Sequence, residues 1–342
     1  MRALLTDEQE LLRDTVEHLA NRTGEPVPEL GADQPTDDWP KLVEMGVTAI
    51  ATPDRDGLGG VDVAVVCEAL GRHLSPLAYL GSCVLPTALL ADAESKHAHL
   101  DELADGRRIA VAFDRDLADV LTGPTGVAFD AAGAAGAIVA AGDRLALAPL
   151  AREQRHAIDL TRATFDVVVA DDRPAVAPRP PARASRWRTL ATIGLCADMV
   201  GVMSSALDRA VSYASHRRQF GRPIGSFQAI QQLCAEQHVR VESARSTMYY
   251  AAWAIDHLDA DEAWSAARAA KIYVGEAARM VAEAAIQVHG GIGMTWESDL
   301  HVHLRRIMLD RQVLGSPATL LHQAAMRFGN QGSDSKPDLY AT

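Results

Sequence analysis

The chain has 342 residues, of which 48% are apolar and 5% aromatic, and its formal net charge is −12. A chain of this length and apolar content can bury a large core and form more than one domain. The acidic balance argues against a nucleic-acid partner, because phosphate backbones are bound by basic surfaces.

Cysteine usage and the N-terminus indicate a cytoplasmic protein. The four cysteines lie in apolar, helical surroundings without a C-x-x-C spacing, which predicts reduced, buried thiols with no metal site and no disulfide. The first twelve residues, MRALLTDEQELL, carry acids where a signal peptide would have an apolar run. No stretch approaches eighteen uncharged apolar residues, so we expect no membrane span.

Residues 1–104 are predicted to form an N-terminal helical domain. Thr6 and Gln9 have the spacing of a capping box at the start of the first helix. Further helices are predicted over residues 39–50 and 61–73. On the second of these, Glu68 and Arg72 are spaced i, i+4, and we interpret them as members of a surface or interhelical ion pair.

The pattern changes over residues 105–184, where short β-type runs are separated by Gly, Asp and Pro. These runs cover residues 109–113, 126–129, 136–139, 145–147 and 165–170. They predict a small, antiparallel middle β domain. The proline-rich stretch PAVAPRPP, residues 174–181, predicts an extended linker at its end.

Residues 185–329 have the pattern of long helices rich in alanine, whose small side chains favour close helix packing. A polar tail, residues 330–342, is predicted to fray. The fold class expected from the sequence is therefore mainly α, with a small β domain between two helical domains.

Two glycine-containing turns interrupt the last helical region. The first, RRQFGRPIGSFQ, covers residues 217–228, and the second, QVHGGIG, covers residues 287–293. Each turn alone can be explained by structure without any function, the first as a corner between helices and the second as a helix end. Together, in this order and at this distance, they resemble the acyl-CoA dehydrogenase family of flavoenzymes.

The resemblance implies an N-terminal helical domain, a β barrel, here reduced in size, and a C-terminal four-helix bundle that builds the oligomer. It also implies FAD as the cofactor, with both turns reaching the FAD of a neighbouring subunit. The FAD-contacting residues implied here are Arg217, Gln219, Phe220, Gln228, Gln287, Gly290 and Gly291. A guanidinium suits a diphosphate, and glycines let backbone amides approach an anion. Without its surrounding motif, Arg217 would equally suit a salt bridge.

Other parts of the family's machinery are missing. The family dehydrogenates an acyl-CoA at its α and β carbons, with a Glu that removes the α-proton and a flavin that accepts the hydride. The two positions that carry this Glu in the family fall here at about Ala191 and Leu314, and neither residue can accept a proton. The family's Thr-Glu-Pro-x-Ala-Gly-Ser-Asp loop, which holds the flavin ring, is replaced by residues 113–124.

Two other carboxylates are weak candidates for a displaced base, Asp198 and Glu297. The plain reading of Asp198 is a polar group between helices. The plain reading of Glu297 is a cap on the following helix. In the family an acid at the position of Glu297 is structural and faces basic residues of the next helix, where Arg305 and Arg306 are available.

These features predict the short, non-catalytic subunit of a heteromeric acyl-CoA dehydrogenase of the actinobacterial steroid side-chain type. A longer partner would carry the catalytic Glu and hold a bulky steroid acyl-CoA, in an α2β2 heterotetramer with FAD at the heteromeric interfaces and an electron-transfer protein as acceptor. Two alternatives remain open. One is a self-sufficient homotetramer with a displaced base, and the other is a flavin-free scaffold that only shapes its partner.

Overall fold

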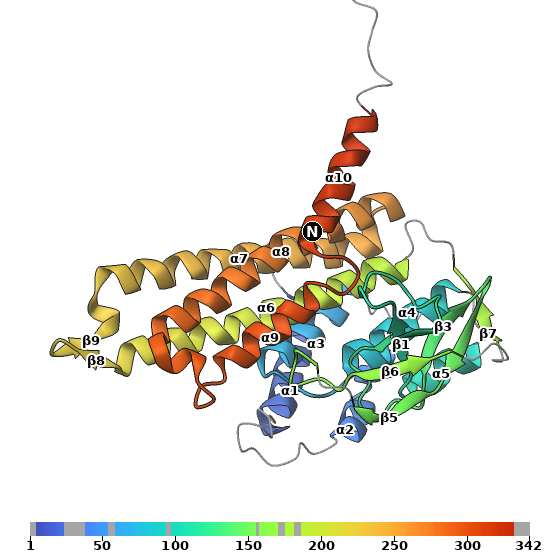
Figure 1. Ribbon diagram of the computed structural model, residues 1–342, viewed down its shortest axis with the longest axis horizontal. Helices are drawn as coiled ribbons and strands as arrows, with labels where there is room; N and C mark the ends of the chain where they lie inside the picture. The colour runs from blue at the N-terminus through green and yellow to red at the C-terminus, as the bar shows by residue number, and fades with distance from the viewer. Residues whose placement is uncertain are drawn as a thin grey trace, which may run out of the picture.

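The computed structural model describes residues 5–23, 38–53, 59–93, 97–154, 157–169, 175–180 and 186–331. Along the chain these residues form a group of helices, then a curled sheet, and then a bundle of long helices (Figure 1). The fold class predicted from the sequence is confirmed. The domain boundaries proposed at residues 104, 184 and 329 stay predictions, and most of the predicted tail lies outside the described residues.

The N-terminal part contains short helices packed around one core. Its elements are α1(Asp7–Thr23), α2(Trp39–Glu44), η2(Val47–Ala49), α3(Gly60–Arg72), η3(Leu80–Val84), α4(Leu85–Asp92) and α5(His97–Ala104). The predicted capping box is confirmed, because the Thr6 amide donates to Gln9 Oε1 at 3.1 Å and the Gln9 amide donates to Thr6 Oγ1 at 3.3 Å.

Of the two kinds of ion pair predicted for Glu68 and Arg72, surface or interhelical, the structure shows the interhelical kind. Glu68 accepts a hydrogen bond from Arg245 Nε at 2.8 Å, and Arg72 pairs with Asp208 at 2.5 Å. Both partners lie on long C-terminal helices that pack against α3. The interhelical reading is therefore confirmed, whereas the identity of each partner could not be derived from spacing within one helix.

The middle part is one seven-stranded sheet, drawn in green in Figure 1. Its strands are β1(Ala110–Phe113), β2(Thr125–Ala128), β3(Ala137–Ala141), β4(Arg144–Ala148), β5(Leu150–Gln154), β6(Phe165–Val168) and β7(Ala175–Pro178). The strand order is β5-β6-β2-β1-β3-β4-β7, so β5 and β7 are the edges of the described sheet.

The sheet corrects the sequence prediction in three places. The five predicted runs are strands, but β5 was not expected, and β7 forms inside the predicted linker. β7 pairs only with β4, and an edge strand tolerates proline because one side makes no ladder bonds. The pairing of β1 with β3 is parallel, where the sequence predicted an antiparallel domain.

The C-terminal part is the four-helix bundle that the resemblance implied, with a further helix at its end. Its elements are α6(Arg186–His216), β8(Arg218–Gln219), β9(Arg222–Pro223), η4(Ile224–Ser226), α7(Gln228–His257), α8(Ala260–His289), η5(Gly290–Met294), α9(Leu300–Asp310) and α10(Pro317–Gln331). Small residues let the backbones touch. A Cβ at Gly201 of α6 would collide with the Glu68 carbonyl of α3.

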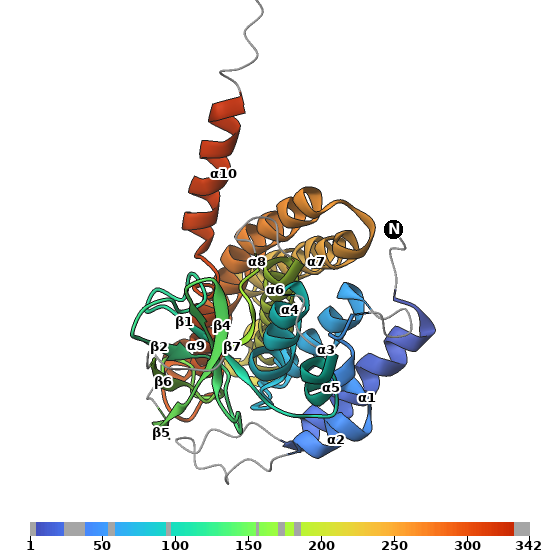
Figure 2. The ribbon, with the colours of Figure 1, turned by 90° about the vertical axis from the view of Figure 1, so that its right-hand side faces the viewer.

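Two helices of this part differ sharply in environment. α6 is long and apolar enough to cross a membrane, but 94% of its most apolar 18-residue window is buried inside the protein, so this helix forms the core of the bundle. α10 instead stands away from the body in both views (Figures 1 and 2). Its Leu321 and Met326 side chains are 57% and 58% exposed.

Candidate cofactor site

The two motif turns lie together at one end of the bundle. The first follows the end of α6 and the second follows the end of α8. The rings of Tyr213 and His289 stack with their centroids 4.1 Å apart, which joins the two helix ends directly. A small apolar cluster underneath contains Ala210, Ala214, Ala285 and Val288. Segments about seventy residues apart in sequence therefore present one continuous exposed surface.

The tip of the first turn is a two-stranded hairpin in which Gln219 pairs with Arg222. The residues between them, Phe220 and Gly221, both have left-handed backbones, with φ of 51° and 79°. This conformation is unfavourable for phenylalanine. Phe220 stands edge-on to Phe227 at 6.1 Å between centroids, yet 91% of its surface is exposed. The fold therefore presents a large aromatic side chain to solvent in a defined position.

Several polar groups of the turn have partners within it. Arg218 donates to the Gly221 carbonyl at 3.1 Å, and the Gln219 side-chain amide donates to the Arg218 carbonyl at 2.8 Å. The Arg222 guanidinium lies 4.1 Å from the centre of the Phe227 ring. The exposed Arg217 side chain makes no ion pair or hydrogen bond to any described residue. None of the three arginines forms an ion pair with a described residue, and Arg217 is the one whose side chain has neither a hydrogen bond nor a ring contact, so it is available to an external anion.

The second turn offers open backbone and amide groups. Gln287, Gly290 and Gly291 are exposed, as is Gln228 after the first turn. Gly290 has a φ of 64°, and a Cβ added at Gly290 or Gly291 would meet no atom within 4 Å. The donors of the two turns suit the diphosphate and adenosine half of a dinucleotide. All seven residues implied by the motifs thus lie exposed at this end of the bundle, while their roles toward FAD stay predictions.

The two family base positions lie in the opposite environment, inside the core. Ala191 is fully buried, and Leu314 is 4% exposed. The Leu314 amide donates to the Leu117 carbonyl at 2.7 Å. Leu117 belongs to the segment that replaces the family's flavin-ring loop. A backbone hydrogen bond therefore joins the loop that carries the base in the family to the segment that should hold the ring.

The start of α6, one turn before Ala191, is also closely packed. Trp187, one turn earlier on α6, is 3% exposed. The neighbouring Arg188 pairs with Asp119 of the replaced loop at 2.5 Å. A cavity of only about 20 Å³ is lined by these three side chains together with Leu89, Val120, Leu145, Arg179 and Pro180. A cavity of this size holds about one water molecule, so these residues do not fit an isoalloxazine ring.

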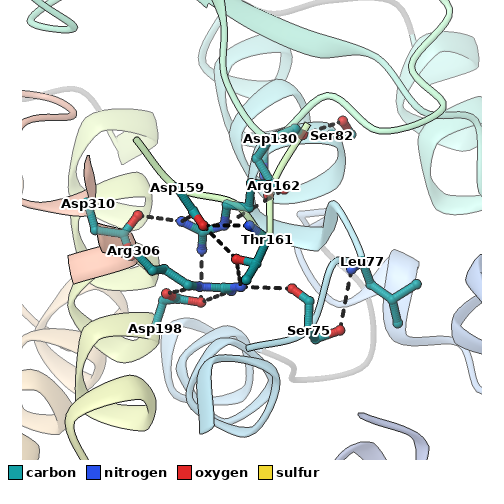
Figure 3. Close-up of polar contacts among 11 residues, drawn as sticks. Ser75, Leu77, Ser82, Asp130, Asp159, Thr161, Arg162, Asp198, Arg306 and Asp310 are labelled. Atoms are coloured by element: carbon teal, nitrogen blue, oxygen red, sulfur yellow. Dashed lines mark hydrogen bonds and ion pairs between the residues drawn. The ribbon is translucent and has the colours of Figure 1, made fainter. Parts of the chain in front are cut away.

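Asp198, one of the two candidate bases, is locked in an ion network (Figure 3). Arg306 binds both carboxylate oxygens, at 2.9 and 2.6 Å, and Arg162 approaches one of them at 2.9 Å. Burial opposes ionisation of Asp198, but the two guanidiniums outweigh burial and hold the pKa of this carboxyl well below its usual range. A carboxylate so stabilised is a poor proton acceptor at neutral pH, so the plain reading as an interhelical polar group is the better one.

The network joins all three parts of the chain. Arg162 lies between β5 and β6 and also pairs with Asp310 at the end of α9. Arg306 donates to the Ser75 carbonyl at 2.8 Å and to Thr161 Oγ1 at 3.0 Å. Burial raises the pKa of Asp310 well above its usual value, which favours a retained proton on that acid. The network therefore stabilises the fold, and neither Asp198 nor Asp310 is available as a catalytic base.

Glu297, the other candidate, is exposed, and its expected contacts are absent from the described residues. Arg306 pairs with Asp198, and Arg305 lies 5.7 Å from the centre of the Trp296 ring. The residue before α9 is Asp299, whose side chain makes no capping bond and instead pairs with Arg209 at 2.6 Å. Glu297 is therefore neither the cap nor the partner of the basic residues that the sequence predicted.

Three buried polar residues were missed from the sequence. Arg162 gave no signal, because its stretch, DLTRATF, is polar. Lys271 is fully buried, and its ammonium donates to the carbonyls of Asp310 and Val313. His303 is fully buried between α6 and α9. A charged or polar residue on the apolar face of each helical pattern was the signal available for Lys271 and His303.

Family models match both helical parts of the chain. The model described as "Acyl-CoA dehydrogenase, N-terminal domain" matches residues 6–107, and "Acyl-CoA dehydrogenase, C-terminal domain" matches residues 189–329. Acyl-CoA dehydrogenase IpdE2 of Mycolicibacterium smegmatis is 32% identical over 343 residues, with coverage of 93% of this chain and 98% of the relative.

Solved structures of two-chain assemblies are similar in fold. The ChsE4-ChsE5 complex from Mycobacterium tuberculosis aligns with a TM-score of 0.80 at 23% identity, covering 98% of this chain and 100% of that chain. A variant of the Tcur3481-Tcur3483 steroid ACAD aligns with a TM-score of 0.80 at 26% identity, covering 96% and 99%. With its motif turns, its fold and a relative 32% identical over nearly its whole length, the chain belongs to the acyl-CoA dehydrogenase family.

Proposed function

We propose that this chain is the non-catalytic subunit of a heteromeric, FAD-dependent acyl-CoA dehydrogenase. The observation that carries the proposal is a contrast within one chain. Both family base positions, Ala191 and Leu314, are buried and apolar, whereas Arg217 is exposed and unpaired among the described residues. A dehydrogenase subunit that cannot remove a proton can still supply cofactor contacts to a partner that does.

The chain's own residues would hold the nucleotide half of FAD. The Arg217 guanidinium would bind the diphosphate, and its planar donors match phosphate oxygens. The Gly290 and Gly291 backbones leave room for a close approach. The remaining contacts toward the adenosine half would come from Gln219, Phe220, Gln228 and Gln287. Bound FAD supplies the hydride acceptor of the reaction.

The partner would be a longer acyl-CoA dehydrogenase chain that carries the flavin-ring loop, the catalytic Glu and the acyl-CoA, with the two kinds of chain forming α2β2. We further propose a bulky steroid side-chain CoA ester as the substrate and an electron-transfer protein as the acceptor, in the cytoplasm. The likeness to a structure titled as a steroid ACAD, at 26% identity, supports this substrate class.

The position of α10 supports assembly with other chains. This helix has 15 residues and stands away from the body. A helix of that length is marginal in water without tertiary contacts. Its exposed Leu321 and Met326 side chains therefore suit burial against another subunit.

The test is flavin content, measured on the chain alone and after co-expression with a longer acyl-CoA dehydrogenase subunit. We expect colourless protein alone and yellow, acyl-CoA-reducible protein in the complex. Yellow protein that acyl-CoA reduces without any partner would support the self-sufficient homotetramer instead. Flavin binding in the complex that survives Arg217→Ala combined with Gln287→Ala would favour a scaffold that makes no cofactor contact.

A further inference from the structure

A cavity of about 580 Å³ lies between α1, α3 and α6. None of its lining residues belongs to the two motif turns, and none belongs to the buried ion network. Binding sites for small molecules commonly have volumes of about 300–1,000 Å³. The cavity is therefore large enough for a ligand of nucleotide size, and the proposed cofactor contacts make no use of it.

Hydrogen-bond donors dominate the lining. Arg72 and His73 come from the end of α3, Arg209 and Ser212 come from α6, and Asn21 comes from α1. Two guanidiniums thus line one cavity in a chain whose net charge is −12, and Arg209 also pairs with Asp299, outside the lining, at 2.6 Å. Clustered arginine and hydroxyl donors are the groups that bind phosphate oxygens.

Among the described residues of the lining, Asp208 is the only acid, and it is weakly held. Asp208 pairs with Arg72 at 2.5 Å, and their side chains are 61% and 37% exposed. Exposed ion pairs of this kind stabilise a protein little, because water competes for both charges. A phosphate carries more charge and more acceptor oxygens than a carboxylate, so it can displace Asp208 from Arg72 at small cost.

We propose that this cavity binds a phosphate-bearing ligand of nucleotide size, with Arg72 as the principal contact. Two sources share that chemistry, the nucleotide end of a CoA thioester and a free nucleotide diphosphate. The inference is independent of the proposed FAD contacts, because it concerns different residues on different helices.

The test is calorimetric titration of the full chain carrying Arg217→Ala, so that the motif turn cannot contribute phosphate binding. The probes are CoA, ADP and inorganic pyrophosphate. We expect saturable binding of one ligand per chain, with tighter binding of CoA indicating the thioester source and equal binding of CoA and ADP indicating a free nucleotide. In this background Arg72→Gln should weaken binding about tenfold. Asp208→Asn should strengthen it by roughly twofold to fivefold, because the competing carboxylate is gone.

Two control variants make the same charge changes elsewhere. Arg144→Gln and Asp143→Asn lie next to each other at the exposed β3–β4 turn, where the side chains are 62% and 96% exposed. We expect both to leave the affinities unchanged. Absence of saturable binding by all three probes would overturn the proposal, as would equal weakening by Arg72→Gln and Arg144→Gln, which would indicate a general charge effect.

Discussion

The exposed end of the bundle and its buried centre differ in whether their charged side chains have partners. At the end, Arg217 has no described partner and faces solvent. In the centre, Arg162 and Arg306 are 2% exposed and are bound by aspartates from the middle and C-terminal parts of the chain. A charge left unpaired at a surface is available to a ligand, whereas a buried and paired charge stabilises the fold.

The backbone shows the same division. Phe220 and Leu314 both have left-handed backbones, with φ of 51° and 62°. Phe220 is exposed at the tip of the turn, whereas Leu314 is buried and bonded to Leu117. An unusual backbone needs support from its surroundings. At Phe220 the left-handed backbone exposes the side chain to solvent. At Leu314 it accompanies burial of the residue at the position where the family carries its base.

The largest effect on stability is expected from a substitution in the buried ion network. Arg162→Met leaves Asp198, Asp310 and their neighbours without one of their two guanidiniums, and removing one partner of a buried ion network costs about 3–5 kcal/mol. The free energy of unfolding, measured by urea titration at pH 7, should fall by that amount. The exposed Arg144→Met is the matched control and should change nothing. An equal response of the two variants would mean that the network does not stabilise the fold.

A second effect should appear on acidification. Burial lowers the pKa of His303 to about 4, against about 6.5 in an unfolded chain. Between these values the unfolded state binds more protons than the native state, so this group's contribution to stability falls as the pH is lowered. The loss reaches about 3 kcal/mol at pH 4 and about 2 kcal/mol at pH 5.

His303→Gln should remove this pH-dependent part. The stability difference between the parent chain and the variant should shrink by about 2 kcal/mol between pH 7 and pH 5, as measured by chemical unfolding at both values. The exposed His257→Gln is the control, and its difference from the parent should stay constant. A constant difference for His303→Gln would show that the imidazole charges without penalty.

A third prediction separates two adjacent glycines. Gly290 has a φ of 64°, and Gly291 has no positive φ. Gly290→Ala should destabilise the chain by about 1–3 kcal/mol, because a φ of 64° with a ψ of −142° is a backbone conformation that alanine resists. Gly291→Ala should leave thermal unfolding unchanged, while weakening FAD binding in the complex if the backbone approaches the cofactor there. Unchanged FAD affinity in the Gly291 variant would remove that glycine from the site.

A small effect on stability is also expected from Phe220→Ala. Because 91% of its surface is exposed, its removal should change the free energy of unfolding by less than about 0.5 kcal/mol. Phe113→Ala is the contrasting control, since that ring is fully buried and its loss costs about 3–5 kcal/mol. A large destabilisation by Phe220→Ala would mean that this residue holds the hairpin together and does not serve a partner.

Sequence reasoning succeeded where the signal is local. Turn residues and helical periodicity predicted the end of the bundle and the helices that lead to it. Short β-type runs separated by Gly, Asp and Pro predicted five strands. It failed where stability comes from contacts between distant segments. Arg162 meets Asp310 across 148 positions, and Glu68 meets Arg245 across 177, so no spacing rule within one element predicts either pair.

Sequence reasoning also failed for a segment whose composition indicates a different structure from the one it forms. Ala175–Pro178 has the composition of a linker, but it pairs with the edge of β4 and forms β7. The empty base positions were visible from the sequence, since Ala191 and Leu314 cannot ionise. The closure of the space around them was not visible, because it depends on a backbone bond between residues 117 and 314.

The most direct test of the central claim is titration of FAD into the purified chain, into a candidate catalytic partner, and into their mixture. We predict tight binding only in the mixture, with the affinity falling by about tenfold to a hundredfold when the chain carries Arg217→Ala and Gln287→Ala. Stoichiometric FAD binding by this chain alone, followed by reduction with an acyl-CoA, would contradict the account.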